Sequence, residues 1–415
     1  MRAASRPAGA ADAVDGVQAD VVVEPASLDE ASEALRETTA RGRRVVCRGG
    51  GSKLGWGNPP AGAEVMLATA RLDRVLEHAE GDLIVRAEAG VRLDALQETL
   101  AKAGQVLALD PPEHGATLGG IVATGASGPR RLRYGTPRDL LIGITVVLSD
   151  GTVARAGGKV VKNVAGYDLG KLFTGSLGTL GLIAEVTFRL HPAPDAVAGA
   201  ALDVADPDAA GAAAQALLHA QLDPVSLELS WPDPEGAGRL VAVLQGRSPI
   251  VLRQAEEAVR LLRPHGGAEP LAADVLGTPD EPDELGSRPW QGLREAVGVK
   301  AACVPTELPG VIRDLWAAAG AHGLGVAVKA HAGAGVTYAA LRGDGVDALA
   351  AALEEARGRI GRRGGTLQVL QAPVEVKRRV DAWGPPGDAL ALMRRVKERF
   401  DPAGTMSPGR FVGGI

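Results

Sequence analysis

Apolar and polar positions divide the first 195 residues into short strand-like runs and amphipathic helical stretches. Ser27 and Glu30 have the spacing of a capping box in front of the first helical stretch. Strand, helix and strand follow one another, with glycine-rich loops at strand ends, which is typical of an α/β or α+β domain. The predicted strands are 21–23, 44–47, 83–89, 140–147, 153–156 and 180–190, and the predicted helices are 31–39 and 93–103.

The pattern changes after Pro194. Asp206 and Pro207 predict a capped helix start, and the Ala-rich helix continues to about Leu222. Shorter strands and helices then alternate, with strands predicted at 301–308, 325–331 and 366–370, a loop at 269–289 and a last helix at 388–400. We expect an α+β fold with a disordered tail at 1–20, a first domain at 21–195, a second at 196–375 and a C-terminal segment at 376–415.

Composition narrows the class of protein. A net charge of -5 argues against a general nucleic-acid binder. The two cysteines, Cys47 and Cys303, lie far apart in sequence, so we expect neither a disulfide framework nor a cysteine-ligated iron–sulfur cluster. The chain has no apolar run of about 18 residues and no signal-peptide pattern at its start. We therefore expect a cytoplasmic protein that reaches a membrane only through partners.

Glycine is abundant, at 56 of 415 residues, and gathers in three segments. The first segment, Arg48 to Leu54, follows a predicted strand and contains three consecutive glycines. Successive N–H groups without a Cβ can point into one concavity, which suits a pyrophosphate. An ordinary flexible turn is the alternative, and the segment is neither a Walker A motif nor a dinucleotide fingerprint.

The other two segments are also rich in small residues. Ala116 to Gly128 follows Asp110-Pro111-Pro112 and predicts a long loop that lies along a ligand, because each glycine in a helix would cost roughly 1 kcal/mol. A glycine-rich helix contact is the alternative. The third segment joins Lys162–Asp168 to glycines at 175, 178 and 181 that lead into a strand. A plain turn is its alternative.

In this order and spacing, the three segments resemble the PCMH-type FAD-binding domain of the vanillyl-alcohol-oxidase-like superfamily. Phe400–Gly404 and Pro408–Arg410 resemble the C-terminal signature of the same family. Lys53–Pro59 resembles the smaller flavin subunit of bacterial glycolate oxidases. The resemblance implies FAD, an α+β, ferredoxin-like cap domain, and a C-terminal segment that returns to the FAD domain. No histidine lies in the first glycine segment, so we expect the FAD to be non-covalent.

The resemblance also carries over to single positions. It implies FAD contacts from Arg48, Gly49, Gly50, Gly51, Ser52, Lys53 and Leu54; from Pro111, Thr117, Leu118, Gly119, Gly120, Thr124, Gly125, Ser127, Gly128 and Tyr134; and from Asn163, Gly175, Gly178, Gly181, Ile183 and Arg410. Leu177 replaces the acidic residue that catalytic relatives carry in the third segment, and Gly125 and Ser127 also depart from the family pattern.

A larger departure lies at His331–Tyr338. Relatives that oxidise 2-hydroxy acids often carry two metal-ligating histidines here, and in this chain only His331 remains, with Ala334 and Tyr338 at other key positions. A single imidazole cannot build a metal site, so we expect none and interpret His331 first as a structural or pocket-lining residue. Lys329 and His331 would share one strand face. The candidates for contact with a substrate are Lys329, His331 and Tyr338.

The resemblance implies a subunit of a glycolate oxidase (dehydrogenase) complex that converts glycolate to glyoxylate. The implied partners are a larger FAD-binding subunit and an iron–sulfur subunit. The altered His331–Tyr338 segment favours an accessory or electron-relaying flavoprotein. A self-sufficient, D-lactate-like 2-hydroxy acid dehydrogenase and a stand-alone flavin alcohol oxidase remain alternatives, whereas the intact glycine segments disfavour a scaffold that has lost FAD.

Overall fold

The computed structural model describes residues 3–158, 167–271 and 285–415 and divides into two compact units. The first unit comprises the chain up to Ser127, Thr136–Ala193 and Pro385–Ile415. The second comprises Gly128–Gly135 and Pro194–Gly384. The predicted division at 195/196 differs from the observed one by two residues. The return to the first unit begins at Pro385 and not at 376, and the excursion at 128–135 was not predicted.

The first unit contains a four-stranded sheet in the order β1-β2-β4-β3. Strands β2, β4 and β3 run parallel, and β1 pairs antiparallel with β2. Ser27 caps helix α1 by accepting a hydrogen bond from the Glu30 N–H at 3.2 Å, as its spacing predicts. The bounds are β1 Ala4–Pro7, β2 Val21–Glu24, α1 Leu28–Ala40, β3 Val45–Arg48 and β4 Val65–Ala68.

The expected disordered tail is instead an ordered arm in this structure. Its strand β1 pairs with β2, and Asp15-Gly16 makes a tight turn between Val14 and Val17. Positive φ angles of 48° and 80° at these two residues are typical of a type I′ turn. Val14 is buried with residues of β2, β3 and β4, so the small apolar residues of the arm complete a core that composition alone did not reveal.

A second sheet in the first unit has the order β5-β6-β10-β8-β9 and is antiparallel throughout. Short helices lie around it, and a two-stranded ribbon joins β7 to β11. The strand bounds are β5 Val75–Ala79, β6 Ile84–Glu88, β7 Gln105–Val106, β8 Leu141–Val147, β9 Val153–Gly157, β10 Leu182–Arg189 and β11 His191–Pro192. The helix bounds are α2 Leu93–Ala101, α3 Leu118–Thr124, α5 Pro137–Leu140 and α6 Leu169–Phe173.

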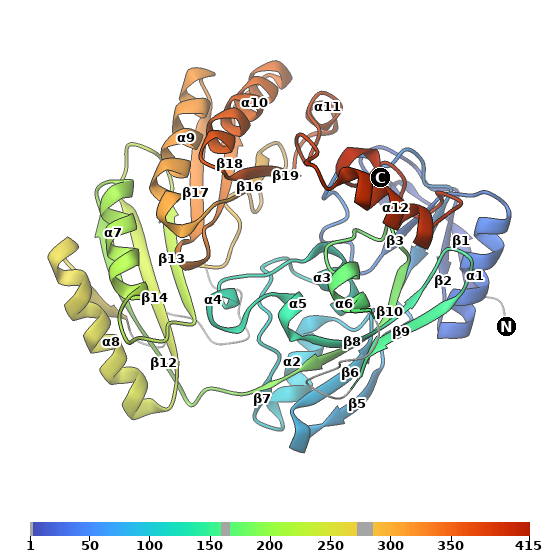
Figure 1. The fold of residues 1–415 in the computed structure, drawn as a ribbon, viewed down its shortest axis with the longest axis horizontal. Helices are drawn as coiled ribbons and strands as arrows, with labels where there is room; N and C mark the ends of the chain where they lie inside the picture. Colours follow the sequence, from blue (N-terminus) through green and yellow to red (C-terminus); the bar gives the residue numbers. More distant parts are fainter. Residues whose placement is uncertain (1–2, 159–166, 272–284) are drawn as a thin grey trace. The chain divides into compact units, whose positions relative to one another are not determined.

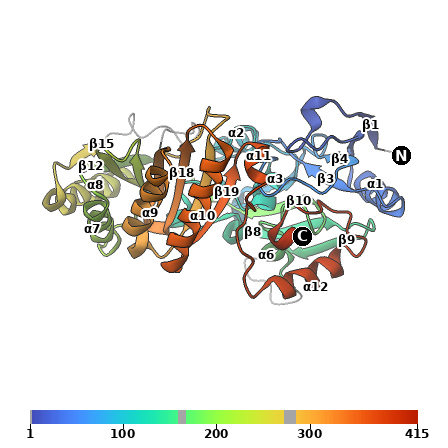
Figure 2. The ribbon, with the colours of Figure 1, turned by 90° about the horizontal axis from the view of Figure 1, so that it is seen from above.

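The C-terminal segment packs on the same unit through helix α12, Leu390–Phe400. Phe400 meets Phe173 of α6 edge to face, with ring centroids 5.7 Å apart, and α12 and α6 lie close together in Figure 2. Lys397 donates hydrogen bonds of 2.7 Å to Thr179 O, Asp401 Oδ2 and Met406 O. Burial acts to raise the pKa of Asp401, but the charge and hydrogen bond of Lys397, with the N–H donors of Met406 and Thr405, outweigh burial and lower that pKa.

The second unit is built on an eight-stranded sheet in the order β15-β12-β14-β13-β17-β18-β16-β19. Each half follows the chain order βαββαβ, and β13 and β17 join the two halves antiparallel. The first half contains β12 Ala196–Val204, α7 Pro207–Leu218, β13 Ser226–Trp231, β14 Gly238–Gly246, α8 Ser248–Leu262 and β15 Glu269–Leu271. The second contains β16 Val297–Ala302, α9 Leu308–Ala321, β17 Gly325–His331, β18 Val336–Arg342, α10 Val346–Arg362 and β19 Thr366–Gln371.

Helices α7, α8, α9 and α10 cover one face of this sheet (Figure 1), and one hydrophobic core lies beneath all four. Asp206 caps α7 with a 2.9 Å hydrogen bond from the Ala209 N–H, as predicted. The prediction of a strand over 301–308 was wrong. Strand β16 ends at Ala302, and Pro305, which lacks an N–H, opens a short helical turn before α9.

No helix in residues 3–158, 167–271 or 285–415 is both long enough and apolar enough to cross a membrane.

Small helices complete the second unit: α4, Arg131–Tyr134, lies against β13, and α11 spans Val374–Lys377.

Candidate functional site

A cavity lies within the first unit. All three glycine segments contribute to its walls. The predicted residues that line it are Arg48, Gly49, Gly50, Gly51, Ser52, Lys53, Leu54, Thr117, Gly119, Gly120, Thr124, Gly178, Gly181, Ile183 and Arg410. The lining also includes Cys47, Thr69, Ala89, Ala123, Leu177 and Leu182, which were not among the predicted FAD contacts.

Other predicted contacts lie elsewhere. Pro111, Leu118, Gly125, Ser127 and Gly175 belong to the first unit but do not line the cavity, and Leu118 is buried inside α3. Gly128 and Tyr134 belong to the second unit. Asn163 and its neighbour Lys162 fall outside the residues that the structure describes.

The first wall is the loop Gly49–Gly51, which directly follows β3. A Cβ at Gly50 would lie 1.9 Å from the carbonyl oxygen of Gly115, so the loop can reach this position only without a side chain. The neighbouring backbone is fixed, because a carbonyl cannot swing away as a flexible side chain can. The close approach holds the first and second glycine segments together and forms one end of the cavity.

The second wall is helix α3, which corrects the prediction of a long loop. Thr117 caps the helix, with the Gly120 N–H 3.4 Å from its hydroxyl. A Cβ at Gly119 would lie 2.6 Å from the Cβ of Ala89, while the Gly119 N–H donates to Ala89 O at 2.8 Å. Glycine lowers helix propensity, but here it permits a backbone contact that a larger residue would block. The close packing of Gly119 against Ala89 therefore outweighs the lower helix propensity of glycine.

The third wall is the turn from Leu177 into strand β10. The Leu177 N–H donates to Ala123 O at 2.8 Å, which ties this turn to helix α3. Leu177 itself has a positive φ of 52°, an uncommon conformation for a residue with a large side chain. Together with Leu182 and Ile183 it gives the cavity an apolar side, suited to a flat ring system rather than to a phosphate.

Three basic side chains complete the lining. Lys53 is buried, and its Nζ lies 4.0 Å from the Glu113 carboxylate. Arg410 is also buried and donates to the backbone oxygens of Leu54 and Trp56, the latter at 2.6 Å. Burial lowers the pKa of Arg410 to about 10, which leaves it charged at neutral pH. With Arg48, these residues make the glycine-rich part of the cavity suitable for an anion.

Covalent attachment has little support in this cavity. Among the described residues, no histidine lines it. Burial raises the pKa of the Cys47 thiol to about 12, so the nucleophilic thiolate is scarce at neutral pH. The residues that are present fit a dinucleotide flavin held by non-covalent contacts: a glycine cradle, three cations and an apolar wall.

The substrate candidates from the sequence meet in the second unit, on the sheet face opposite the helices. Tyr338 of β18 pairs directly with Lys329 of β17 on one side and with Lys300 of β16 on the other. The Arg288 guanidinium lies over the Tyr338 ring, with Cζ 3.9 Å from its centroid. Lys329 donates to Ser287 Oγ at 2.5 Å. Strand register thus brings Lys300 and Lys329 beside one phenol ring, and a loop brings Arg288 over it.

His331 is placed by a buried carboxylate. Its Nδ1 lies 2.7 Å from Glu228 Oε2, and β13 and β17 pair these two residues directly. A carboxylate that accepts from Nδ1–H fixes this tautomer of the neutral ring and leaves Nε2 as the acceptor nitrogen. The His331 ring also packs edge to face on Tyr338 at 5.3 Å. The sequence did not single out Glu228, Lys300 or Arg288, since strand register reveals the first two and tertiary packing reveals the third.

The residues at 331–338 do not fit the two-histidine metal site that relatives often carry at this segment. Tyr338 and Ala334 offer no imidazole or carboxylate, so His331 is the one imidazole in the segment 331–338. Within the described ranges, no group of three or more His, Cys, Asp or Glu side chains could hold a metal ion.

Comparison with known families matches two parts of the chain. Residues 19–157 match the FAD binding domain family. Residues 383–411 match the C-terminal domain of FAD linked oxidases. Both matches fall mainly in the first unit, which contains the cavity.

Curated relatives extend over most of the chain. The D-lactate dehydrogenase of Archaeoglobus fulgidus is 28% identical over 425 residues, covering 94% of this chain and 91% of the relative. The glycolate oxidase subunit GlcD of Bacillus subtilis is 27% identical, covering 94% and 88%. The glycolate oxidase subunit GlcE of Escherichia coli is 36% identical over a shorter stretch of 173 residues, which is 41% of this chain and 48% of that subunit.

Solved structures share the fold at low sequence identity. p-Cresol methylhydroxylase with bound substrate has a TM-score of 0.76 at 15% identity and covers 95% of this chain and 89% of its own. An alkyldihydroxyacetonephosphate synthase has a TM-score of 0.71 at 18% identity, covering 94% and 76%. The chain therefore contains an FAD binding domain at 19–157 and the C-terminal domain of FAD linked oxidases at 383–411, shares its fold with p-cresol methylhydroxylase, and has FAD as its cofactor.

Proposed function

We propose that this protein is the FAD-binding subunit of a 2-hydroxy acid dehydrogenase complex of the glycolate oxidase type. The cavity of the first unit carries this proposal, because its glycine segments, cations and apolar wall occur together in one FAD-binding domain. The relatives named D-lactate dehydrogenase and glycolate oxidase subunit supply the substrate class, a small acid with a hydroxyl on the carbon next to the carboxylate.

The residues of the first unit divide the work of holding FAD. Backbone N–H groups of Gly49–Gly51 and the side chains of Arg48 and Lys53 would hold the pyrophosphate. The apolar surface of Leu177, Leu182 and Ile183 would meet the flavin ring and exclude water. FAD supplies the redox chemistry when bound, and the protein orients and tunes it.

The second unit would recognise the acid. A carboxylate suits the group formed by Arg288, Lys300, Lys329 and Tyr338, where cationic and hydroxyl donors lie around one position. Burial lowers the pKa of Lys300, Tyr338 acts in the opposite direction, and the positive charges of Arg131 and Arg288 lower the pKa further. A bound anion would relieve this repulsion. Recognition of the carboxylate does not by itself oxidise the acid.

The missing metal ligands favour an accessory, electron-relaying role over independent catalysis. In this first candidate, a larger FAD-binding subunit oxidises glycolate to glyoxylate, and an iron–sulfur subunit carries the electrons away. The chain would reach a membrane only through these partners. The first candidate predicts that the purified chain binds FAD but leaves it oxidised when the acid is added.

A second candidate, a self-sufficient 2-hydroxy acid dehydrogenase, rests on His331 and Glu228. A histidine whose Nδ1–H is held by a carboxylate is a suitable general base at Nε2. In this version His331 would take the hydroxyl proton of the acid without a metal. Glu228 would orient the ring and stabilise the imidazolium that forms.

Anaerobic absorbance of the bound flavin separates the two candidates. Glycolate or D-lactate is added to the purified holoprotein, and the larger subunit is added afterwards. Bleaching only after that addition supports the relay role. Rapid bleaching of the chain alone supports the second candidate, and it should then be lost in His331→Asn. A chain that neither co-purifies with FAD nor binds it when FAD is added contradicts the whole proposal.

A further inference from the structure

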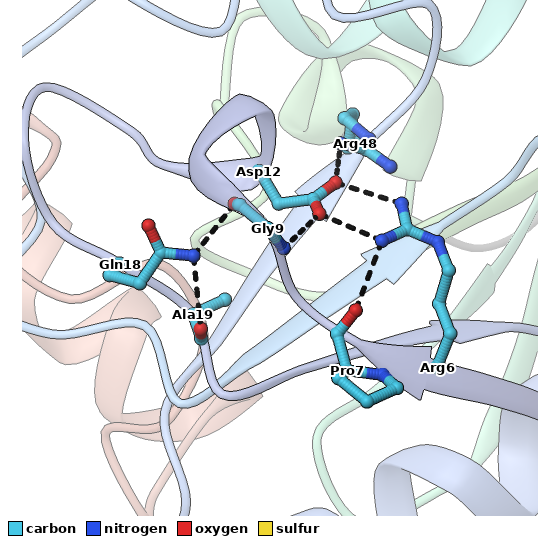
Figure 3. Close-up of polar contacts among 7 residues, drawn as sticks. All are labelled: Arg6, Pro7, Gly9, Asp12, Gln18, Ala19 and Arg48. Atoms are coloured by element: carbon cyan, nitrogen blue, oxygen red, sulfur yellow. Dashed lines mark hydrogen bonds and ion pairs between the residues drawn. The ribbon is translucent and has the colours of Figure 1, made fainter.

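The N-terminal arm, residues 4–19, reaches an arginine of the FAD cavity (Figure 3). Asp12 Oδ1 accepts a 2.6 Å hydrogen bond from Nη1 of Arg48, which lines the cavity immediately before the glycine loop. The same carboxylate binds Arg6 at both oxygens, at 2.8 and 2.9 Å. The Gly9 N–H donates a fourth hydrogen bond, of 2.8 Å, to Oδ2. Asp12, which lies outside both family-matched segments, thus contacts the side chain nearest the cradle.

These contacts make Asp12 a rigid partner for Arg48. Asp12 is 3% exposed, and the hydrogen bonds from Arg6, Gly9 and Arg48 hold its pKa well below the usual range for a carboxyl. The carboxylate is therefore charged at neutral pH. Arg48 is also mostly buried, with 18% of its side chain exposed, so its guanidinium has few other positions.

The backbone of the arm is held in place by its own contacts. Gln18 Nε2 donates to the carbonyl oxygens of Gly9 at 2.7 Å and Ala19 at 3.4 Å, which closes the loop that presents Asp12. The Asp15-Gly16 turn and buried Val14 fix the other side of that loop. Asp15 also acts on the second cavity arginine, because its charge raises the pKa of Arg410 against the larger, opposite effect of burial.

We propose that the arm is part of the FAD site and that Asp12 is a positioning residue for Arg48. Asp12 holds the guanidinium at the glycine cradle before the cofactor arrives, so binding loses less side-chain freedom. Arg6 shares the carboxylate, and therefore Asp12 does not fully cancel the two positive charges beside it. The proposal depends on FAD as the cofactor and not on the 2-hydroxy acid as the substrate.

Positioning and simple electrostatics predict opposite results for one substitution. Asp12→Asn removes a negative charge beside the cavity, so charge alone predicts tighter binding of anionic FAD. If Asp12 acts by placing Arg48, the same substitution weakens binding. The matched control is Asp20→Asn, because exposed Asp20 directly follows the arm. Its carboxylate pairs with Arg43 at 2.9 Å, and neither residue lines the cavity.

The experiment is titration of the full-length apoprotein with FAD, followed by quenching of flavin fluorescence, with the melting temperature of each apoprotein measured in parallel. We expect Asp12→Asn to weaken FAD binding about tenfold and Asp20→Asn to leave it within about twofold. Arg6→Gln, at a half-exposed position that tolerates substitution, should loosen Asp12 and weaken binding about threefold. Arg6→Gln keeps the proposal testable if Asp12→Asn does not fold.

A double-mutant cycle with Arg48→Met identifies the route of the effect. In the Arg48→Met background, Asp12→Asn and Arg6→Gln should change FAD affinity by less than about twofold, because the residue that they position is gone. Unchanged or tighter binding in both single variants overturns the proposal. An equal loss with and without Arg48 overturns it as well, since that result would assign the arm a purely structural role.

Discussion

The two units present their chemistry in different ways. In the first, the cavity is lined largely by consecutive residues, such as Arg48–Leu54, whose backbone groups face one hollow. In the second, the group around Tyr338 comes from separate strands and a loop, and only cross-strand register unites Glu228, Lys300 and Lys329. Sites made from one loop can be read as motifs. Sites made by register become visible only when the strands are paired.

The largest expected effect tests the backbone-built cavity. Gly50→Val places a side chain where even a Cβ would lie 1.9 Å from Gly115 O, so the loop must move away from the cradle. We expect FAD affinity to fall by about a hundredfold or more, measured as the ratio of flavin to protein absorbance after purification and by titration of the apoprotein.

Gly81→Ala is the control for that loss. Gly81 lies in the same unit, and a Cβ there meets nothing within 4 Å. It should retain FAD as the wild type does. The comparison between units adds a second requirement: Gly50→Val should still bind small carboxylates through the second unit. Loss of both activities together would mean that the variant is unfolded, and retained FAD would contradict the close approach in the cradle.

Much of the first unit could be predicted from sequence because backbone donors depend on glycine rather than on a particular side chain. The segments Arg48–Leu54 and Gly178–Ile183 both reach the cavity. Helix α3 was missed because helix propensity is a local rule, whereas Gly119 is required by a contact with Ala89, distant in sequence. The arm was missed because Asp12 lies in an Ala-rich stretch, although the Asp15-Gly16 turn signal could have indicated order.

The second unit shows where prediction from the sequence alone fails. His331 and Tyr338 were found through a departure from a family pattern, and Lys329 through strand periodicity. Glu228 lies about a hundred residues earlier, and nothing local marks it as the partner of His331. Arg288 lies near the end of the stretch 269–289, which was interpreted as a loop, and its place over Tyr338 depends on tertiary packing. A single sequence contains no record of which strands pair.

A smaller effect is expected from a substitution in the group around Tyr338. Lys300→Met removes one cation beside Tyr338 and should weaken binding of oxalate roughly tenfold or more. Oxalate is a suitable probe because it has no C–H bond to oxidise. Trp290 packs 6.1 Å from the Tyr338 ring, so its fluorescence should report binding, and Trp290→Phe should remove the signal.

Arg239→Met is the charge-matched control for Lys300→Met. Arg239 lies on the same sheet but pairs with Asp203 and Glu269, so its loss should leave oxalate affinity within about twofold. FAD affinity should stay at the wild-type value in both variants. Equal weakening by both substitutions would mean that only overall charge matters, and the group around Tyr338 would not be a binding site.

The smallest expected effect is the pH dependence of oxalate binding. It distinguishes the second unit, where strand register places a titratable lysine, from the first unit, where backbone N–H groups form the cradle. Burial lowers the pKa of Lys300, and the groups that face it are Tyr338 of β18, Gln368 of β19, Arg131 of α4 and Arg288. An anion favours the protonated amine, so oxalate binding takes up a proton and weakens as pH rises through the Lys300 pKa. We expect oxalate affinity to fall a few-fold per pH unit at most, below the tenfold limit for one proton.

Isothermal titration calorimetry in buffers of different ionisation enthalpy measures this proton uptake, which Lys300→Met should remove. The same uptake in that variant would assign it to another group and leave Lys300 without a part in binding.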